Sequence, residues 1–190
     1  MNNRIRNQES GIRNQARRSS GFTLIEVVVA MAILSIMAAV TITSMSGSKT
    51  KAELDGAARQ LAAAIREAQN YALTGKNLTS TSTNRACQFS VVSTAGSGTF
   101  VLKQASMAGT TCGALANAVT YTLQNGVLFS AGAGSEVRFD VPRGEPRDNT
   151  GAELASGNID FSFAKNGSTA HVCVYPLGRI EERGVGAGSC

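Results

Sequence analysis

A single carboxylate interrupts an apolar segment near the start of the chain. Glu26 is the only charged residue between Phe22 and Met45, a run that contains neither Pro nor Gly. At about 1.5 Å of rise per residue, a helix of this length crosses a hydrocarbon core of about 30 Å. A carboxylate in that setting is costly and indicates a function. The alternative is a Glu close enough to the interface to extend its side chain into water.

The residues before this segment predict its orientation. Arg17 and Arg18 stand just upstream, separated from the apolar run by residues 19–21. Positive charge on the upstream side favours a cytoplasmic position for that end, so the rest of the chain is expected to cross the membrane. An ordinary secretory signal has its cleavage site after a short apolar region. Here the candidate cleavage site lies before the run, which therefore remains in the mature protein as an anchor.

The segment from Gly21 to Glu26, Gly-Phe-Thr-Leu-Ile-Glu after a basic leader, resembles the class III signal of type IV pilins and type II secretion pseudopilins. The resemblance covers roughly residues 11–50. It implies that a prepilin peptidase cleaves between Gly21 and Phe22 and N-methylates the new Phe22 terminus. It also implies that Glu26 meets the N-terminal amine of a neighbouring subunit. A carboxylate and an ammonium that are each costly in lipid become tolerable when they are paired.

Most of the positive charge lies in the leader. The chain has 190 residues and a formal net charge of +5, but residues 1–21 contain five arginines and one glutamate, so the mature chain has a net charge of +1. The overall charge is therefore no argument for nucleic-acid binding. The expected organisation is a prepilin leader at 1–21, a transmembrane helix at 22–48 and a periplasmic head at 49–190, which is one modest domain.

Four cysteines lie beyond the apolar segment: Cys87, Cys112, Cys173 and Cys190. None belongs to a Cys-x-x-Cys pair, so zinc binding is not expected. An even number on the exported side suits two disulfides in an oxidising periplasm. Three pairings are possible, and free buried thiols are the alternative. We favour Cys87–Cys112 with Cys173–Cys190 because each bond closes a local loop, and the second would hold down the Gly-rich residues 184–188.

A second helical pattern follows the apolar run. Helix propensity is low at residues 44–48, and beyond them apolar residues recur at spacings of seven, four, three and four. These residues are Leu54, Leu61, Ile65, Ala68 and Ala72. The spacing predicts one long helix from about 22 to about 74, which is amphipathic in its second half. Gly75-Lys76-Asn77 is expected to end it.

Short strand-like runs dominate the rest of the chain. Clean alternation over 136–141 and 159–163 predicts antiparallel strands with one buried face. Turn signals separate the other strand-like runs. Residues 95–98 separate 88–92 from 99–102, and Asn125-Gly126 separates 119–123 from 127–129. Asn166-Gly167 separates 159–163 from 170–175. Six or seven such strands beside one amphipathic half-helix predict an α+β, pilin-like fold, with the long N-terminal helix packed on one antiparallel sheet or a pair of sheets.

The head shows little sign of catalytic chemistry. His171 is the only histidine, and it stands within a predicted strand, where a structural role is the usual one. The sequence has no serine nucleophile elbow, no phosphate-binding loop and no metal-ligand spacing. We therefore do not expect an enzyme, and we expect neither a cofactor nor a metal.

The segment Val172–Ile180 resembles the closing part of the domain shared by the H-type minor pseudopilin of type II secretion and the type IV pilus protein FimT, the GspH/FimT family. Some FimT proteins bind DNA through Gly-Arg-x-Arg near this end. Here Glu181 occupies the second Arg position and Glu182 follows, which opposes phosphate contact. Two readings stay open. In one, the candidate nucleic-acid contacts Arg179, Arg183 and Lys165 cluster; in the other, Arg179 pairs with Glu181 or Glu182.

The expected function is that of a minor pseudopilin, a structural subunit of a type II secretion pseudopilus in protein export. The alternative is a FimT-like minor type IV pilin in pilus assembly and DNA binding for natural transformation. The expected partners are prepilin peptidase and other pilins or pseudopilins, with nucleic acid disfavoured. The expected location is the bacterial inner membrane, as a single-pass protein with a periplasmic head. The sequence leaves the machine, the secreted substrate and the position in the filament open.

Overall fold

The computed structural model describes residues 21–78, 84–130, 135–154 and 157–190, without the side chains of residues 40–46. The predicted leader thus lies outside the described residues, apart from Gly21. The chain divides into two compact units between Ile42 and Thr43.

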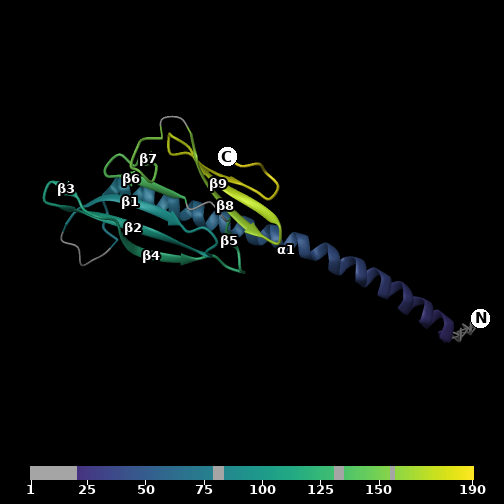
Figure 1. Ribbon diagram of the computed structural model, residues 1–190. Helices are drawn as coiled ribbons and strands as arrows, with labels where there is room; N and C mark the ends of the chain where they lie inside the picture. Colours follow the sequence, from purple (N-terminus) through teal and green to yellow (C-terminus); the bar gives the residue numbers. More distant parts are fainter. Residues whose placement is uncertain (1–20, 79–83, 131–134, 155–156) are drawn as a thin grey trace, which may run out of the picture. The chain divides into compact units, whose positions relative to one another are not determined.

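The predicted long helix is confirmed as α1, Leu24–Thr74 (Figure 1). It continues through residues 44–48 in spite of their low helix propensity. It ends where the sequence predicts: Gly75 has a φ of +66°, and its N–H donates to the Tyr71 carbonyl oxygen at 2.8 Å. Glycine adopts this left-handed conformation without a steric penalty, so it stops the helix cleanly.

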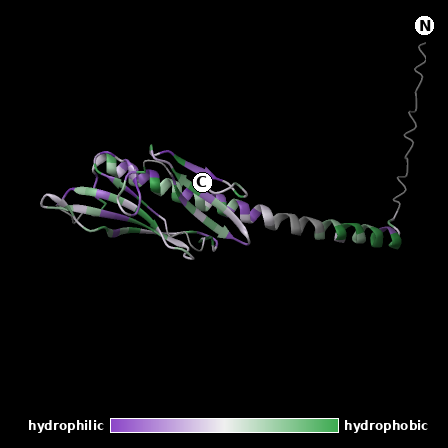
Figure 2. Cartoon of the chain, turned by 45° about the horizontal axis from the view of Figure 1, so that its top comes forward, coloured by the Kyte–Doolittle hydropathy of each residue, from purple (hydrophilic) through white to green (hydrophobic). Residues whose placement is uncertain are grey.

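The first part of α1 exposes its apolar side chains. Leu24, Ile33 and Ile36 are all more than half exposed, and Figure 2 shows the first turns of the helix as hydrophobic. The predicted membrane span, 22–48, includes residues 40–46, whose side chains lie outside the described part of the chain. In the residues that the structure describes, no helix has the length and apolar character needed to cross a membrane.

The second part of α1 buries the predicted stripe. All five of its residues have no exposed surface: they are Leu54, Leu61, Ile65, Ala68 and Ala72. Six alanines at 57, 58, 62, 64, 68 and 72 are buried on this half-helix, and their small side chains let the sheets approach its backbone closely. Burial of this stripe fixes which face of the helix the sheets cover.

The first sheet is antiparallel and follows the order β3-β2-β1-β6-β7, with β4 also paired to β2. Its strands are β1 (Ala86–Ser93), β2 (Thr99–Ala108), β3 (Thr111–Cys112), β4 (Ala116–Thr122), β6 (Glu136–Asp140) and β7 (Pro146–Arg147). The alternation predicted over 136–141 is confirmed, because Val137 and Phe139 are fully buried while their neighbours are not. The predicted pairing of 88–92 with 99–102 is also confirmed.

The second sheet is antiparallel and follows the order β10-β9-β8-β5. Its strands are β5 (Leu128–Phe129), β8 (Ile159–Lys165), β9 (Ser168–Val174) and β10 (Ile180–Arg183). The Asn166-Gly167 turn joins β8 to β9 directly, as the sequence indicates. Asn125 and Gly126 also form a left-handed turn, with φ of 60° and 68°, but they join β4 of the first sheet to β5 of the second. That turn is therefore a crossing between sheets and not a hairpin.

Phenylalanine side chains from both sheets complete the core against the second half of α1. Figure 1 shows this part of the helix running along the sheets. Six of them are at most 1% exposed: Phe89, Phe100, Phe129, Phe139, Phe161 and Phe163. Phe129 and Phe163 lie with ring centroids 5.0 Å apart, which explains why β5 pairs with β8. The described residues contain ten strands. Three of them have only two residues, which is too short for an alternating hydrophobic pattern to be detected. The α+β fold is confirmed, with two sheets.

A polar contact also joins the helix to the first sheet. The Glu67 carboxylate accepts hydrogen bonds from Tyr71, at 2.5 Å, and from Tyr121 of β4, at 3.2 Å. The hydrogen bond to Glu67, together with burial, raises the pKa of Tyr71 to about 12. Tyr121 also stacks on Phe100, with ring centroids 4.9 Å apart, so β4 is held on its inner face by both apolar and polar contacts.

Replacing Ile65 tests the role of the helix stripe. The Ile65→Ala variant leaves a cavity between α1 and the sheets, and we expect the free energy of unfolding to fall by about 2–5 kcal/mol in urea denaturation. Asn70→Ala, an exposed change on the same helix, is the matched control and is expected to change stability by less than about 0.5 kcal/mol. Equal losses in the two variants would contradict the packing described here.

Candidate functional site

The start of α1 is held by Thr23. The backbone N–H of Glu26 lies 3.3 Å from the Thr23 hydroxyl oxygen and 3.1 Å from the Thr23 carbonyl oxygen, as in an N-capped helix. The spacing Thr-x-x-Glu is that of a capping box, a local signal that our reading of the sequence did not use. Because the cap fixes where the helix begins, it places Gly21 and Phe22 outside the helix and Glu26 in its first turn.

The three N-terminal residues predicted to act in processing and assembly are all exposed. Phe22 is 81% exposed, and Gly21 and Glu26 are exposed as well. Among the described residues, no side chain forms a hydrogen bond or an ion pair with the Glu26 carboxylate. A Cβ added at Gly21 would have no described atom within 4 Å, so packing against the described residues does not require glycine there.

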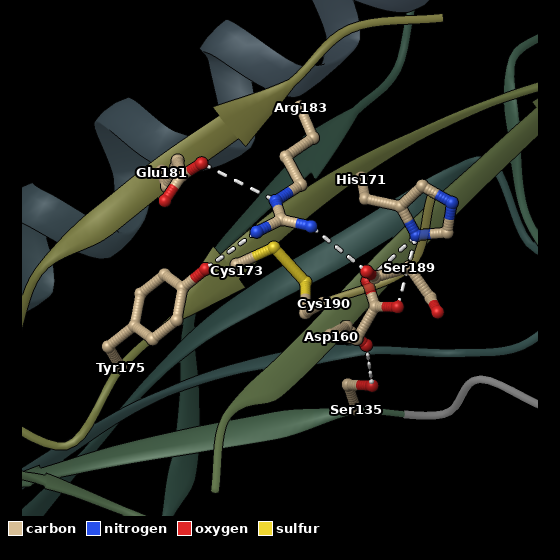
Figure 3. A network of polar contacts seen from close by, with 9 residues as sticks. All are labelled: Ser135, Asp160, His171, Cys173, Tyr175, Glu181, Arg183, Ser189 and Cys190. Carbon is tan, nitrogen blue, oxygen red and sulfur yellow. Dashed lines mark hydrogen bonds and ion pairs between the residues drawn. A yellow bond between two sulfur atoms is a disulfide. The ribbon is translucent and has the colours of Figure 1, made fainter. Parts of the chain in front are cut away.

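The C-terminal arginines Arg179 and Arg183 are paired with a carboxylate, and Figure 3 shows this pair for Arg183. Arg179 lies 3.3 Å from Glu181, and Arg183 lies 3.4 Å from the other oxygen of the same carboxylate. The Arg179 guanidinium also stacks over the Tyr175 ring, 4.1 Å from its centroid. The reading in which Arg179 pairs with an adjacent glutamate is therefore the one that the structure shows. Glu182 instead lies 3.2 Å from Arg66 of α1.

Arg183 also ties the end of the chain to the second sheet. Its guanidinium donates to the Tyr175 hydroxyl at 3.1 Å and to the Ser189 carbonyl oxygen at 3.0 Å, as Figure 3 shows. The hydrogen bond to Tyr175 raises the pKa of Arg183 above its usual value, with Glu181 acting in the same direction. A guanidinium with these contacts orders the tail and is less available to an external anion.

The structure separates Lys165 from the two arginines. The Lys165 ammonium lies 2.5 Å from Glu53 of α1 and donates to the Asn125 carbonyl oxygen. Lys165 pairs with Ser168 at one end of β9, whereas Ile180 pairs with Val174 at the other. The three candidate nucleic-acid contacts therefore form no single cluster, and each of them faces a carboxylate.

His171 has a structural environment. Its Nδ1 atom lies 3.0 Å from the carboxylate of Asp160 on the neighbouring strand, and Ser135 donates to the Asp160 carbonyl oxygen at 2.7 Å. These contacts link β9 and β8 of the second sheet to Ser135, the residue that precedes β6 of the first sheet (Figure 3). In the part of the chain that the structure describes, no group of three His, Cys, Asp or Glu side chains is placed to hold a metal ion.

The structure contains both disulfides of the favoured pairing. Cys87 is bonded to Cys112 and Cys173 to Cys190, so no free thiol remains among the described residues. Cys173 is fully buried on β9, and the Gly186 N–H donates to the Thr169 carbonyl oxygen at 3.4 Å. The tail from Gly184 to Cys190 is therefore held beside β9, by the Gly186 hydrogen bond near its start and by the disulfide at its end.

Removing the second disulfide is expected to release this tail. In a Cys173→Ser, Cys190→Ser double variant, elastase should cut at Ala187 at least about tenfold faster, because the exposed end of the segment loses its covalent link to β9. The matched control is Cys87→Ser with Cys112→Ser, which leaves the tail bonded. Mass spectrometry of the fragments measures both rates, and equal rates in the two variants would contradict the assignment.

Comparisons with known proteins agree with the geometry at the N-terminus. Residues 16–42 match the family model of the prokaryotic N-terminal methylation motif. The chain is also 38% identical over 56 residues to the type II secretion system protein H of Aeromonas hydrophila, a match that covers 30% of this chain and 31% of that protein. The chain thus spans about a third of the length of the curated relative that it matches.

No solved structure matches the chain. The methylation motif covers the Gly21–Glu26 segment at the start of α1, and the described fold is the α+β arrangement that a pilin-like head requires. The motif, the fold and the partial match together identify the chain as a pilin-like protein similar to the H-type pseudopilins.

Proposed function

We propose that this protein is a minor pseudopilin, a structural subunit of a type II secretion pseudopilus. Prepilin peptidase cleaves after Gly21 and methylates Phe22, and the apolar part of α1 then anchors the subunit in the inner membrane with its head in the periplasm. The methylation motif and the similarity to a type II secretion protein H support this proposal. The motif alone is common to pilins and pseudopilins, so the choice of machine rests mainly on the partial match.

The exposed carboxylate of Glu26 is the observation on which the proposal depends most. It stands in the first turn of an apolar helix, and no described residue of its own chain neutralises it. The helix dipole favours a negative charge at this end, but it does not replace a counter-ion in lipid. The amine of a neighbouring Phe22 is a counter-ion of the right charge at the same depth, because both groups lie at the start of the same kind of helix.

A FimT-like minor type IV pilin that binds DNA is the second candidate. One observation favours it: the Arg179 side chain is 67% exposed and its guanidinium lies over the Tyr175 ring, an arrangement that also suits contact with a nucleic acid. Glu181 acts against it, because its carboxylate lies between Arg179 and Arg183 and offsets their charge. The separation of Lys165 from both arginines also leaves no extended basic surface here.

Changes at Gly21 and Glu26 test the first candidate. Gly21→Ala is expected to block leader removal, and Glu26→Ala is expected to leave processing intact while stopping incorporation into filaments. Immunoblotting for the size shift and isolation of sheared filaments measure the two steps. Thr43→Ala, a change outside the signal segment, is the control and should behave as the unaltered chain does.

The outcomes separate processing from folding. Because an added Cβ at Gly21 meets no described atom, a Gly21→Ala chain that accumulates uncleaved is a failed substrate and not a misfolded protein. Normal filament assembly and normal secretion in both variants would remove the pseudopilin proposal.

Titration with duplex DNA tests the second candidate. A head spanning residues 49–190, which contains all of the buried core residues described above, is expected to show no complex at low salt. A micromolar complex that weakens steeply with salt and is lost in Arg179→Ala would favour DNA uptake. Glu181→Gln is the informative companion, since it removes the offsetting carboxylate and should strengthen any contact that the arginines make with phosphate.

A further inference from the structure

The turn between β9 and β10 presents an apolar side chain to solvent. Leu177 is 98% exposed, the highest value among the large apolar residues that the structure describes. Two main-chain hydrogen bonds of 2.9 Å close the turn, from Gly178 to the Tyr175 carbonyl oxygen and from Tyr175 to that of Arg179. Gly178 has a φ of +76°, and a side chain there would collide with Gln69 of α1. Leu177 therefore stands on a rigid turn, and a partner can bury it with little loss of conformational freedom.

Leu177 lies beside the β7 edge of the first sheet. It lines a pocket of about 500 Å³ together with Pro146 of β7. Three exposed charged residues line the same pocket, Arg143, Glu145 and Glu153, and their charges of +1, −1 and −1 sum to −1. Glu145 forms no ion pair with a described residue. The surface at this edge is therefore an apolar projection beside an acidic rim.

The opposite side of the first sheet carries a hollow. Strands β1 and β6 lie between β7 and β2, and β4 pairs with the other side of β2. The hollow has a volume of about 260 Å³ and lies where β4 begins. Its lining is uncharged and consists mainly of small side chains: Gln104, Ser106, Ala114, Ala116, Asn117 and Ala118. A leucine side chain that enters such a hollow is removed from water, which is favourable.

Lys103 supplies a positive charge beside this hollow. It pairs with Asn117 in the register of β2 and β4, so the two side chains lie on the same face of the sheet. No described carboxylate forms an ion pair with the Lys103 ammonium. No other Asp, Glu, Lys or Arg occurs before Glu136. The hollow is therefore complementary in charge to the acidic rim beside Leu177.

We propose that Leu177 of one copy of the chain inserts into the hollow beside β4 of a second copy. The contact is heterologous, because the two copies use different surfaces. The β7 edge of one first sheet lies next to the β4 edge of the other, and Lys103 of the second copy faces the rim formed by Glu145 and Glu153. Both halves of the contact belong to this chain, so a second copy is the occupant that they fit.

The two surfaces lie near the same end of α1. The Leu177 turn packs beside Gln69, and Gln104 of the hollow accepts a hydrogen bond at 2.6 Å from the N–H of Leu78, just beyond the helix. Nine residues separate Gln69 from Leu78, which is about 14 Å at the rise of a helix. A sideways translation therefore joins the two surfaces without turning either copy over. The head halves of the two α1 helices stay parallel, as anchoring in one membrane requires.

The contact is small, since it consists of one apolar side chain and a few charges. Small contacts are weak in solution, but they form when another constraint holds the two chains close together. A shared membrane supplies that constraint here. The inference goes beyond the proposed function and does not depend on it, because neither surface includes Gly21, Phe22 or Glu26.

Cross-linking between two single-cysteine chains tests the contact. Arg143→Cys places a thiol beside Leu177, and Asn117→Cys places one at the hollow. Ala95→Cys, on the exposed turn between β1 and β2, is the matched control for Asn117→Cys. The four native cysteines are in disulfides, so a short bis-maleimide reacts only with the new thiols. With full chains in phospholipid vesicles, we expect Arg143→Cys to give at least about fivefold more mixed dimer with Asn117→Cys than with Ala95→Cys. Equal yields would overturn the proposal.

Changes to the two surfaces separate this contact from chance collision. We expect Leu177→Ser in the Arg143→Cys chain to lower the yield about fivefold by removing the projecting side chain. Ala116→Leu in the Asn117→Cys chain should lower it similarly by filling the hollow, whereas Leu177→Met keeps an apolar side chain of similar size and should retain the yield. Leu177 and Ala116 are both exposed, and hydrogen exchange of β1 and β2 shows that each variant is folded.

Two results in these variants contradict the proposal. One is an unchanged yield in folded Leu177→Ser and Ala116→Leu chains, and the other is an equal fall in Leu177→Met. When the experiment is repeated in cells, cross-linking of the Arg143→Cys chain to a different protein in place of a second copy would exclude the second copy as the occupant.

Discussion

Burial of one stripe of α1 is the constraint on which the head depends. The stripe has no exposed surface, and six alanines are buried on the same half-helix, so the sheets come close to the helix backbone. Large phenylalanines from both sheets fill the remaining space. The second sheet is small, with two strands of seven residues and two shorter ones. The chain passes from the first sheet to the second at Asn125 and Gly126, returns between β5 and β6, and passes to the second sheet again between β7 and β8.

Polar contacts hold this arrangement at its margins. Lys165 links the end of the second sheet to Glu53 of the helix and to the crossing turn, while Glu182 pairs with Arg66. At the far end of the first sheet, Glu67 joins Tyr71 and Tyr121. Most charged groups of the head are thus used within the chain. The N-terminal segment differs, because its large apolar side chains are exposed and no described side chain pairs with Glu26. In the proposed pseudopilin, the stability of the head and assembly through the N-terminus accordingly rest on separate sets of residues.

The features that depend on neighbours in the sequence were predictable. The spacing of Leu54, Leu61 and Ile65 predicted the buried face of the helix, and Asn166-Gly167 predicted the β8–β9 hairpin. The division into two sheets was not predictable from the sequence. Strand β5 has only two residues, and the alternation of its side chains fits a neighbouring strand of either sheet. The role of Lys165 depends on Glu53, which lies 112 residues away in the sequence. At the candidate site, the Gly21–Glu26 segment was recognisable from the sequence. The Thr23 cap was missed, although the Thr-x-x-Glu spacing that signals it is a local pattern.

The crossing at Asn125 and Gly126 has a consequence for the order in which the head folds. The hairpin of β8 and β9 is closed by a short turn, so it can form within microseconds, as local hairpins do. Strand β5 precedes β8 by some 30 residues of chain and has only two residues to pair, so it cannot nucleate a sheet by itself. Strand β5 can pair only after β8 and β9 have formed the hairpin to which it bonds. The second sheet is therefore expected to grow backwards along the chain, from its C-terminal hairpin towards β5, and to close the core last at Phe129.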